Sequence, residues 1–291
     1  MKRLFASLAL SVAVAASIEA QTVYEQDLAK WRTEHEADLR SETGWLAVAG
    51  LSWLKEGVNT VGSGGTYDVE LTDNFKGGKF GEINFSKGVA TLIAASGVNA
   101  TVDGKKVTTI VLESDERSKP TRVQVGTQVF YVIKRVDKYG VRVKDTNSKA
   151  RRDFAGEHWY KPDTRYKVIA KFEEYTRPKD VLIPNVLGTS FKEKAPGLLR
   201  FKIAGKQYTL EPVIEEDHLF IIFKDLTSRT TTYAAGRFLY APMPKDGKVK
   251  LDFNKAENPP CAFTEFATCP LPPRRNRLNV SIPAGEKRTH D

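Results

Sequence analysis

The chain has 291 residues, of which 41% are hydrophobic and 28% charged, and its formal net charge at pH 7 is +9. These values indicate an ordinary globular protein with one large or two medium domains, and they exclude the disordered and fibrous classes. The basic residues are spread along the chain without a compact recognition motif, so we expect no nucleic-acid partner. The charge either favours acidic surfaces or is simply solvated.

A secretory signal peptide is predicted over residues 1–20. Basic Lys2 and Arg3 precede an apolar run from Leu4 to Ile18, and the small residue Ala20 stands before the expected cleavage site. The alternative, an uncleaved membrane anchor, needs roughly 20 apolar residues, which is more than this run supplies. We therefore expect an exported protein, periplasmic or extracellular, with no transmembrane segment in the mature chain.

A short helix is predicted over residues 21–43. Its bulky residues recur at helical spacing and form one stripe, at Tyr24, Leu28, Trp31, His35 and Leu39. Gly44 is placed to end the helix as a C-cap residue. Because His35 lies on the stripe, we interpret it as a packed histidine and not as a ligand.

Residues 44–145 predict a β-sandwich, because short apolar runs follow one another with turn residues between them. Asp103 and Gly104 predict a two-residue hairpin turn. Val141 and Val143 alternate with Arg142 and Lys144, which predicts a strand with one solvated face.

Part of this segment, residues 55–145, resembles a forkhead-associated domain. The likeness lies in the stretches GVNTVGS, SKGVATL and NATVDGKKV. Ser63 stands where that family has its phosphate-binding arginine, and Val89 stands where it has a histidine. The resemblance therefore implies the sandwich topology and not the binding of phosphothreonine.

The second half, residues 146–291, predicts an antiparallel β domain, either a second sandwich or a barrel. It opens with a polar link, in which His158 and the two aromatic residues after it either line a cleft between the halves or simply pack. Short strands follow, and the run Leu219–Phe223 is apolar on both faces, which predicts a central strand. The expected fold class is thus mainly β throughout.

The stretch Arg237–Lys287 holds both cysteines and eight of the fourteen prolines, and we call it the strap. Proline removes backbone donors and restricts its neighbours, so the strap is predicted to be irregular but rigid. Within it, Asp252 and Asn254 share one face of a predicted strand. If Arg237 lies between Asp225 and Asp252, it would lower the pKa of both, as an ion-pair network or as an acid/base pair.

Cys261 and Cys269 are separated by seven residues. We expect a disulfide, because the predicted compartment is oxidising, and closing this loop is worth about 2.5 kcal/mol in the chain-entropy model. A metal site and a reactive thiol are the alternatives, and Cys261 could also join His158 and Asn258 as a nucleophile set. The cysteines lack paired CxxC partners and no two histidines have i, i+4 spacing in a helix, so we expect neither metal nor cofactor.

Motifs along nearly the whole mature chain are similar to those of the bacterial domain-of-unknown-function 1684 (DUF1684) family. They are GWL, GLSWL, GVNTVGS, DFAGEHWY, KDLTSRTTTY, GRFLY, LDFN, NPPCAF, ATCPLPP and AGEK. The resemblance implies no particular activity. It implies one shared constellation of polar residues and cysteines, namely Asp225, Tyr233, Arg237, Asp252, Asn254, Asn258, Cys261, Cys269 and Asn276.

The leading functional hypothesis is a binding protein with a polar pocket beside the strap. In it Arg237, Asn254 and Asn258, with Tyr233, His158 and Asn276 nearby, hold an acidic or sugar-like small molecule or glycan. A hydrolase that uses Asp225 or Asp252 as general base is the first alternative. A purely structural or protein-interaction module is the second, and the sequence does not define the oligomeric state.

Overall fold

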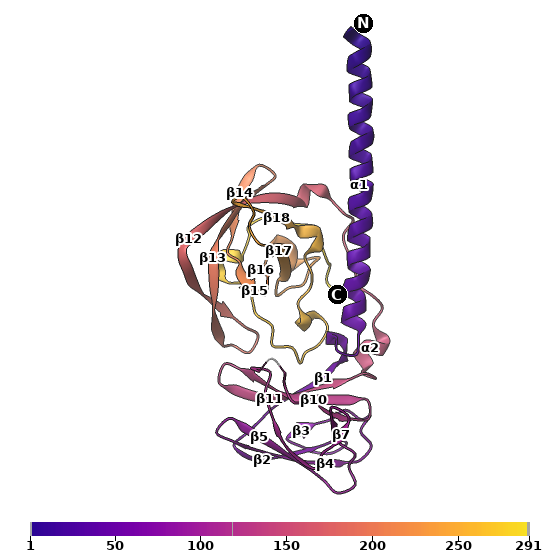
Figure 1. Cartoon of the computed structure of the whole chain (residues 1–291), viewed down its shortest axis with the longest axis vertical. Coiled ribbons are helices and arrows are strands. Elements are labelled where there is room, and N and C mark those ends of the chain that lie inside the picture. Colours follow the sequence, from indigo (N-terminus) through magenta and orange to yellow (C-terminus); the bar gives the residue numbers. More distant parts are fainter. Residues whose placement is uncertain (1, 118, 290–291) are drawn as a thin grey trace.

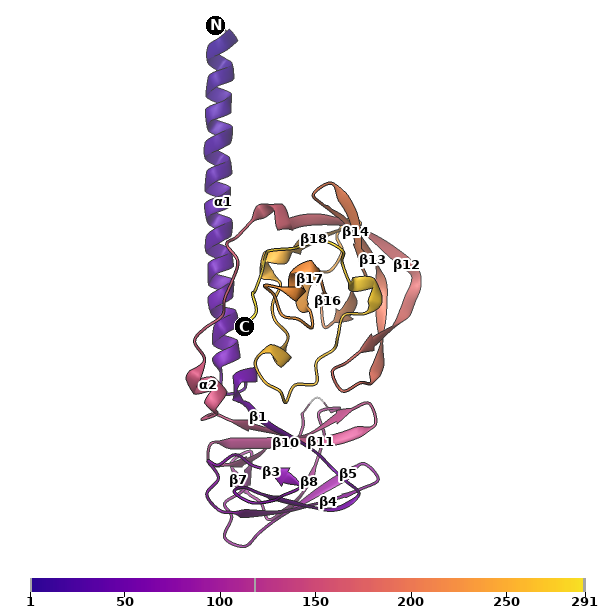
Figure 2. The same cartoon turned by 180° about the vertical axis from the view of Figure 1, so that it is seen from behind.

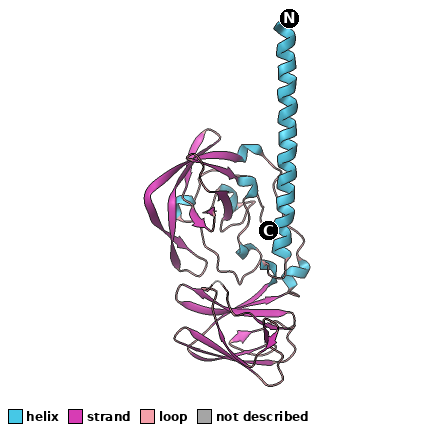
Figure 3. Ribbon diagram, in the orientation of Figure 1, coloured by secondary structure: helices cyan, strands magenta, loops and turns pink. Residues whose placement is uncertain are grey.

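The computed structural model describes residues 2–117 and 119–289, and side chains from residue 21 onward. The chain is mainly β, as predicted, and its strands form several mostly antiparallel sheets (Figure 3). One long helix runs beside the β structure and projects beyond it at its N-terminal end (Figure 1).

This helix, α1 (Lys2–Arg40), is continuous from the predicted signal segment into the predicted short helix. It ends at Arg40, four residues before Gly44, and a 3-10 turn, η1 (Trp45–Ala47), follows. The side chains of residues 1–20 lie outside the described part of the chain, so the signal peptide stays a prediction. No helix among the described residues is long and apolar enough to cross a membrane.

The N-terminal half is a sandwich of two sheets. The larger sheet has the order β1-β11-β10-β9-β6-β7, with β1 (Val48–Trp53), β6 (Thr101–Val102), β7 (Lys105–Lys106), β9 (Val123–Val125), β10 (Gln128–Arg135) and β11 (Lys138–Asp145). The other has the order β3-β2-β4-β5-β8, with β2 (Gly57–Gly62), β3 (Val69–Glu70), β4 (Lys79–Ser86), β5 (Val89–Ala94) and β8 (Thr109–Leu112). The forkhead-associated resemblance and the boundaries of the two halves stay predictions.

Buried apolar side chains such as Phe80, Ile83 and Phe130 fill the space between the two sheets. Asp103 and Gly104 both have positive φ and form the predicted hairpin turn between β6 and β7. The prediction of a solvated face was wrong for Arg142, which is only 3% exposed because its guanidinium lies over the ring of Trp45, 5.1 Å away.

The link between the halves contains α2 (Lys149–Asp153) and η2 (Thr164–Tyr166). A four-stranded sheet follows, in the order β14-β13-β12-β18, with β12 (Lys167–Pro184), β13 (Ser190–Ile203), β14 (Lys206–Leu210) and β18 (Lys248–Asp252). A three-stranded sheet, β15-β16-β17, contains β15 (Val213–Glu215), β16 (His218–Phe223) and β17 (Arg237–Pro242). The long strands β12 and β13 curve around the smaller sheet and the strap (Figure 2).

The predicted central strand is confirmed, since β16 pairs with both β15 and β17. One face of this sheet carries Leu219, Ile221 and Leu239 into the main core of the C-terminal half. The opposite face carries Ile222 and Phe238 into a smaller apolar cluster under the β12–β13 hairpin. Because β16 is apolar on both faces, it packs into both of these clusters.

The strap begins with the strands β17 and β18 and is irregular beyond them, with short 3-10 turns and hydrogen bonds to distant segments, as its prolines predict. The 3-10 turns of this half are η3 (Leu226–Arg229), η4 (Phe253–Lys255), η5 (Pro260–Ala262) and η6 (Arg274–Asn276). Gly285 adopts φ +80°, and a Cβ there would lie 2.4 Å from the carbonyl oxygen of Ala256. Only glycine fits this close crossing of two strap segments.

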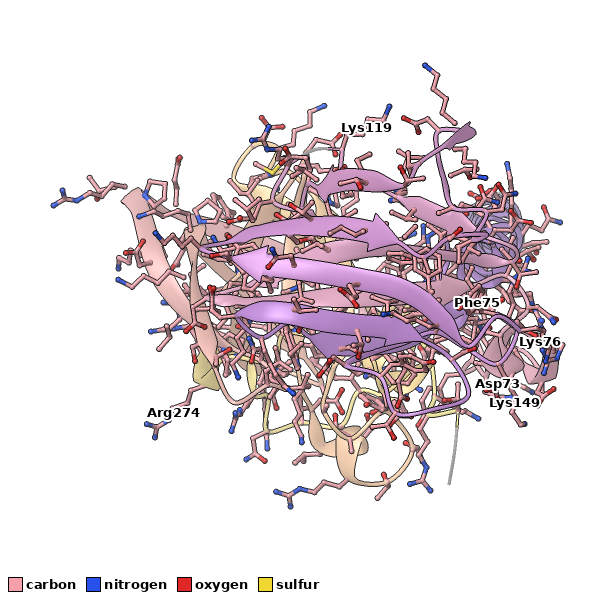
Figure 4. The ribbon with its side chains drawn as sticks, turned by 90° about the horizontal axis from the view of Figure 1, so that it is seen from below. Asp73, Phe75, Lys76, Lys119, Lys149 and Arg274 are labelled. Atoms are coloured by element: carbon pink, nitrogen blue, oxygen red, sulfur yellow. The ribbon has the colours of Figure 1, made fainter. Side chains whose placement is uncertain are left out.

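Basic side chains are distributed around the molecule. In Figure 4, Lys119 and Arg274 lie on different sides from Lys76 and Lys149. This distribution favours a generally solvated basic surface over one concentrated anion-binding patch.

Candidate functional site

Arg237 and Asp225 form a sealed ion pair inside the C-terminal half. The Arg237 side chain is 0% exposed, and its Nη2 lies 2.7 Å from Oδ2 of Asp225. The guanidinium also donates to the carbonyl oxygens of Ile282 and Ala284. Asp225 in turn accepts from Thr227 and caps η3. These contacts hold the end of the strap to the small sheet and leave Arg237 no exposed surface for a ligand.

Asp252 does not complete the expected network with Arg237. Both of its carboxylate oxygens accept from the hydroxyl of Tyr24 at 2.9 Å, and Oδ1 also caps η4 through the backbone of Asn254. Burial, followed by the charge of Asp252, raises the pKa of Tyr24, which keeps the phenol proton available for this bond. Asp252 thus anchors α1 to the C-terminal half.

Asn254 and Asn276 each bind the backbone of a distant segment in both directions. Asn254 accepts from the amide of Asp163 and donates to its carbonyl oxygen, both at 2.9 Å. Asn276 does the same with Glu211, at 2.8 and 3.0 Å, and adds the carbonyl of Ile222. A carboxamide presents one donor and one acceptor side by side, as a peptide bond does, so these residues act as internal clamps.

Tyr233 and the two cysteines form a compact group in the strap. The Tyr233 hydroxyl donates to the carbonyl oxygen of Cys261 at 2.9 Å. The backbone amide of Cys261 lies 3.1 Å from Sγ of Cys269, and both residues are free thiols. The hydrogen bond between the thiols lowers the pKa of Cys261 and raises that of Cys269. The disulfide stays a prediction.

The aromatic cluster of the link is divided between different environments. Trp159 packs edge-on against Trp31, with the ring centroids 5.6 Å apart, and Arg32 lies over its ring. Tyr160 borders a cavity of about 480 Å³ near Gln21. His158 is exposed, and none of the three lines the large cleft described next.

A cleft of about 980 Å³ lies beside the strap, where the two halves and the end of α1 meet. Its floor is the outer face of the sheet β15-β16-β17, with Phe220 and Ile222 from β16 and Phe238 and Tyr240 from β17. The rings of Phe220 and Tyr240 are stacked, with centroids 4.9 Å apart. Tyr240 is 42% exposed, so the cleft offers an accessible aromatic ring.

The walls of the cleft come from four different parts of the chain. The β12–β13 hairpin supplies one wall, the strap a second, the end of α1 a third, and the β10–β11 turn of the N-terminal half a fourth. Among the predicted site residues, Asn258 and Cys269 line it. Two contacts between the halves lie close by, from Arg135 to Thr268 at 3.0 Å and from Thr264 to the carbonyl of Val48 at 3.1 Å.

At one edge of the cleft His35 lies between two carboxylates. Its Nδ1 is 2.8 Å from Glu157 and its Nε2 is 3.1 Å from Glu257. Burial alone would lower the pKa of His35, but these two hydrogen bonds reverse the effect and raise it to about 10. The imidazole is therefore charged at neutral pH, packed as predicted and also ion-paired.

Glu286 lies behind this pair and is 0% exposed. Burial, with the nearby Glu157 adding repulsion, raises the pKa of Glu286 to about 8. One oxygen accepts from the backbone amide of Asn258 at 2.6 Å, while Oε1 has no hydrogen-bond partner among the described residues. The arrangement is consistent with a carboxyl that keeps its proton at neutral pH. Within the described residues no group of three or more His, Cys, Asp or Glu side chains could hold a metal ion.

Residues 152–287 match the model of a family described as "Protein of unknown function (DUF1684)". This segment belongs to the DUF1684 family. Its bounds enclose the strap and the whole cleft floor. No curated protein matches the chain. The chain is also similar to an uncharacterized protein of Haloarcula marismortui solved by solution NMR, with 29% identity, coverage of 47% of this chain and 78% of the other, and a TM-score of 0.40.

Sequence reasoning did not identify most of the residues that line the cleft. Glu157 and Glu286 do not line the cleft but lie beside His35 at its edge. They stand in the DUF1684 motifs DFAGEHWY and AGEK, where an ionisable side chain among small and aromatic residues was an available signal. Phe220 occupies an alternate position of the predicted central strand, whereas Tyr240 lies in the strap, which was predicted to be irregular and forms β17 there. That alternation could have shown a second apolar face, but nothing in it tells whether that face packs against protein or borders a cavity.

Proposed function

We propose that the chain is an exported binding protein that holds a small, sugar-like ligand in the cleft beside the strap. The observation that carries this proposal is the cleft itself. Its volume of about 980 Å³ falls in the range of ligand sites, and its floor is apolar while its rim is polar. Exposed aromatic rings such as Tyr240 provide flat surfaces against which a sugar ring or another flat apolar face packs.

Export is supported by the predicted leader and by the position of α1. The N-terminal part of this helix projects beyond the β structure (Figure 1). Removal of residues 1–20 would leave the contacts of Tyr24 and Leu28 in place. The mature helix would therefore keep its docking surface.

The hydrolase alternative has no support from the two residues it named. Asp225 is sealed with Arg237, Asp252 binds Tyr24, and neither lines the cleft. The purely structural alternative predicts that substitutions in the cleft have no effect on the binding of small molecules. Ligand-observed NMR tests this.

The test is ligand-observed NMR with the purified mature protein and a panel of neutral, amino and acidic monosaccharides, together with small aromatic amines and acids. We expect at least one class to give saturation transfer. Tyr240→Ala should reduce that signal by about fivefold or more, because it removes the exposed ring.

Leu182→Ala is the matched control. Leu182 is 61% exposed and alternates with Ile183, which lines the cleft, so its side chain points away from the site. If both variants lose the saturation-transfer signal equally, or if Tyr240→Ala keeps the full signal, the ligand binds outside the cleft. No response to any class would remove the proposal.

A further inference from the structure

We propose that the cleft selects ligands bearing a positively charged amine, carried on a sugar ring or another flat, partly apolar body. This inference rests on the proposed function and assigns the chemical class of its ligand. It departs from the expectation of an acidic ligand.

The lining of the cleft is rich in carboxylates. The carboxylates of Asp38, Glu193, Glu215 and Glu257 border the cleft, in a chain whose net charge is +9. Within the described residues, Asp38 and Glu193 form no ion pair. The lining therefore carries unneutralised negative charge against the overall sign of the protein.

The basic groups of the lining are already engaged. Lys134 lies 2.9 Å from Glu116, and Arg135 lies 2.9 Å from Asp115. His35 is held between Glu157 and Glu257. An anionic ligand would compete with these carboxylates for the basic groups, whereas a cationic ligand would meet the carboxylates of Asp38 and Glu193, which are unpaired within the described chain.

Glu215 is the centre of this acidic region. The Tyr240 hydroxyl donates to its Oε2 at 3.3 Å, which places the carboxylate beside the exposed ring. Burial raises the pKa of Glu215, and the nearby Glu216, Glu193 and Glu257 raise it further. A bound cation would relieve this mutual repulsion, so the carboxylates gain more from an ammonium group than an isolated glutamate would.

A second, independent observation comes from Asn258. The residue is only 3% exposed and lines the cleft, and its Oδ1 has no hydrogen-bond partner within the described chain. Its Nδ2 is committed to the carbonyl oxygen of Lys287 at 2.8 Å, which fixes the orientation of the amide. A buried acceptor without a donor is unfavourable unless a ligand supplies the N–H or O–H.

The aromatic floor completes the recognition chemistry. Phe220 and Tyr240 stack on each other, and Phe238 meets Phe220 edge-on at 4.9 Å. The face of such a ring attracts an ammonium group as well as a flat apolar body. Carboxylates, an unpartnered buried acceptor and aromatic faces together match a ligand that is cationic and donor-rich.

The test uses two matched probe sets with isothermal titration calorimetry on the full mature chain. The first compares glucosamine, glucose and glucuronate, which share a ring and differ in charge. The second compares tyramine with 3-(4-hydroxyphenyl)propionate, so that a sugar amine and an aromatic amine can be distinguished. We expect one amine to bind at least about tenfold more tightly than its neutral or acidic counterpart.

Glu215→Gln should weaken binding of that amine by about tenfold, since it removes the charge and keeps the size of the side chain. Glu265→Gln is the control, because Glu265 is exposed in the strap and does not line the cleft.

If glucose binds as tightly as glucosamine, or if glucuronate or 3-(4-hydroxyphenyl)propionate binds more tightly than the matching amine, the charge assignment is overturned. The cleft would still be the binding site. If none of the five probes binds, the amine assignment is overturned. Whether the proposed function also fails is then decided by the broader panel and the Tyr240→Ala comparison. Retention of full amine affinity in Glu215→Gln would likewise overturn the inference.

Discussion

Arg237 shows that a residue type suited to ligand recognition can serve the interior instead. Its guanidinium satisfies one carboxylate and two carbonyl groups at once, which is the geometry that would also suit a bound anion. The sequence indicated an arginine near acidic strand positions, but whether the partners face inward or outward depends on the path of the strap.

Arg237→Leu is expected to lower the free energy of unfolding by about 3–5 kcal/mol, because it leaves the Asp225 carboxylate buried and unpaired. Urea denaturation monitored by tryptophan fluorescence measures this. Lys194→Met, which removes an exposed pair with Asp180, should cost less than about 1 kcal/mol. A small effect for Arg237→Leu would mean that the pair is not sealed.

Glu286 predicts a specific dependence of stability on pH. Its carboxyl has an ordinary pKa of 4.5 in the unfolded chain and about 8 in the folded one. Between these values the unfolded chain loses the proton first, so the free energy of unfolding falls as pH rises, by up to about 1.4 kcal/mol per pH unit. The contribution of His35 is fully present below its ordinary pKa of 6.5 and is lost as pH rises through about 10.

Glu286→Gln keeps an acceptor for the amide of Asn258 and removes the ionisable group. Urea midpoints measured between about pH 5 and pH 8 should therefore decline less steeply in this variant than in the parent. The decline that arises from His35 at higher pH should remain. Identical slopes in parent and variant would show that Glu286 ionises normally.

At the scale of elements, α1 is part of the C-terminal half although it begins the chain. Leu28 is 1% exposed, Tyr24 binds Asp252 and His35 joins two glutamates of that half. Helical spacing predicted the stripe that packs, but it could not identify the surface on which the stripe lies.

Leu28→Ala is expected to lower the free energy of unfolding by about 2–5 kcal/mol, through lost burial and the cavity left behind. Val23→Ala, at a site that is 52% exposed on the same helix, should change it by less than about 0.5 kcal/mol. Thermal and urea unfolding of both variants measure the difference. Equal, small effects would mean that the helix is not docked in solution.

The strap carries a prediction of its own through its two thiols. Oxidation in the exported protein should join Cys261 and Cys269 and raise the free energy of unfolding by about 2.5 kcal/mol. Mass spectrometry after alkylation, with and without prior reduction, detects the bridge, and thermal unfolding with and without reductant measures its effect. Cys261→Ser should melt at the same temperature under both conditions. Two alkylated thiols in freshly exported protein would contradict the prediction.

Strand periodicity predicted much of the architecture and little of the site. Alternation placed Val141 and Val143 inward, and the apolar run Leu219–Phe223 identified β16 as central, because both outcomes depend on neighbours along the chain. Arg142 was predicted to be solvated and is buried, because Trp45 covers it from a separate segment. The cleft escaped prediction for the same reason, since its walls come from four regions that meet only after folding.

For the whole molecule, export predicts a defined mature start. Protein secreted from cells that carry the full-length gene should begin at Gln21, because Ala20 is the small residue before the expected cleavage site. N-terminal sequencing together with the intact mass of the secreted fraction measures this. An unprocessed chain retained inside the cell would contradict it.

The bounds of the matched family segment and those of the physical unit differ. Residues 152–287 include Glu157, Glu257 and Glu286 but not His35, the imidazole that compensates them. A fragment excised at these bounds would carry three crowded acidic groups without their counter-ion and an apolar groove where Leu28 had been. We expect such a fragment to precipitate or to remain partly unfolded, and adding residues 21–40 as a separate peptide to rescue it.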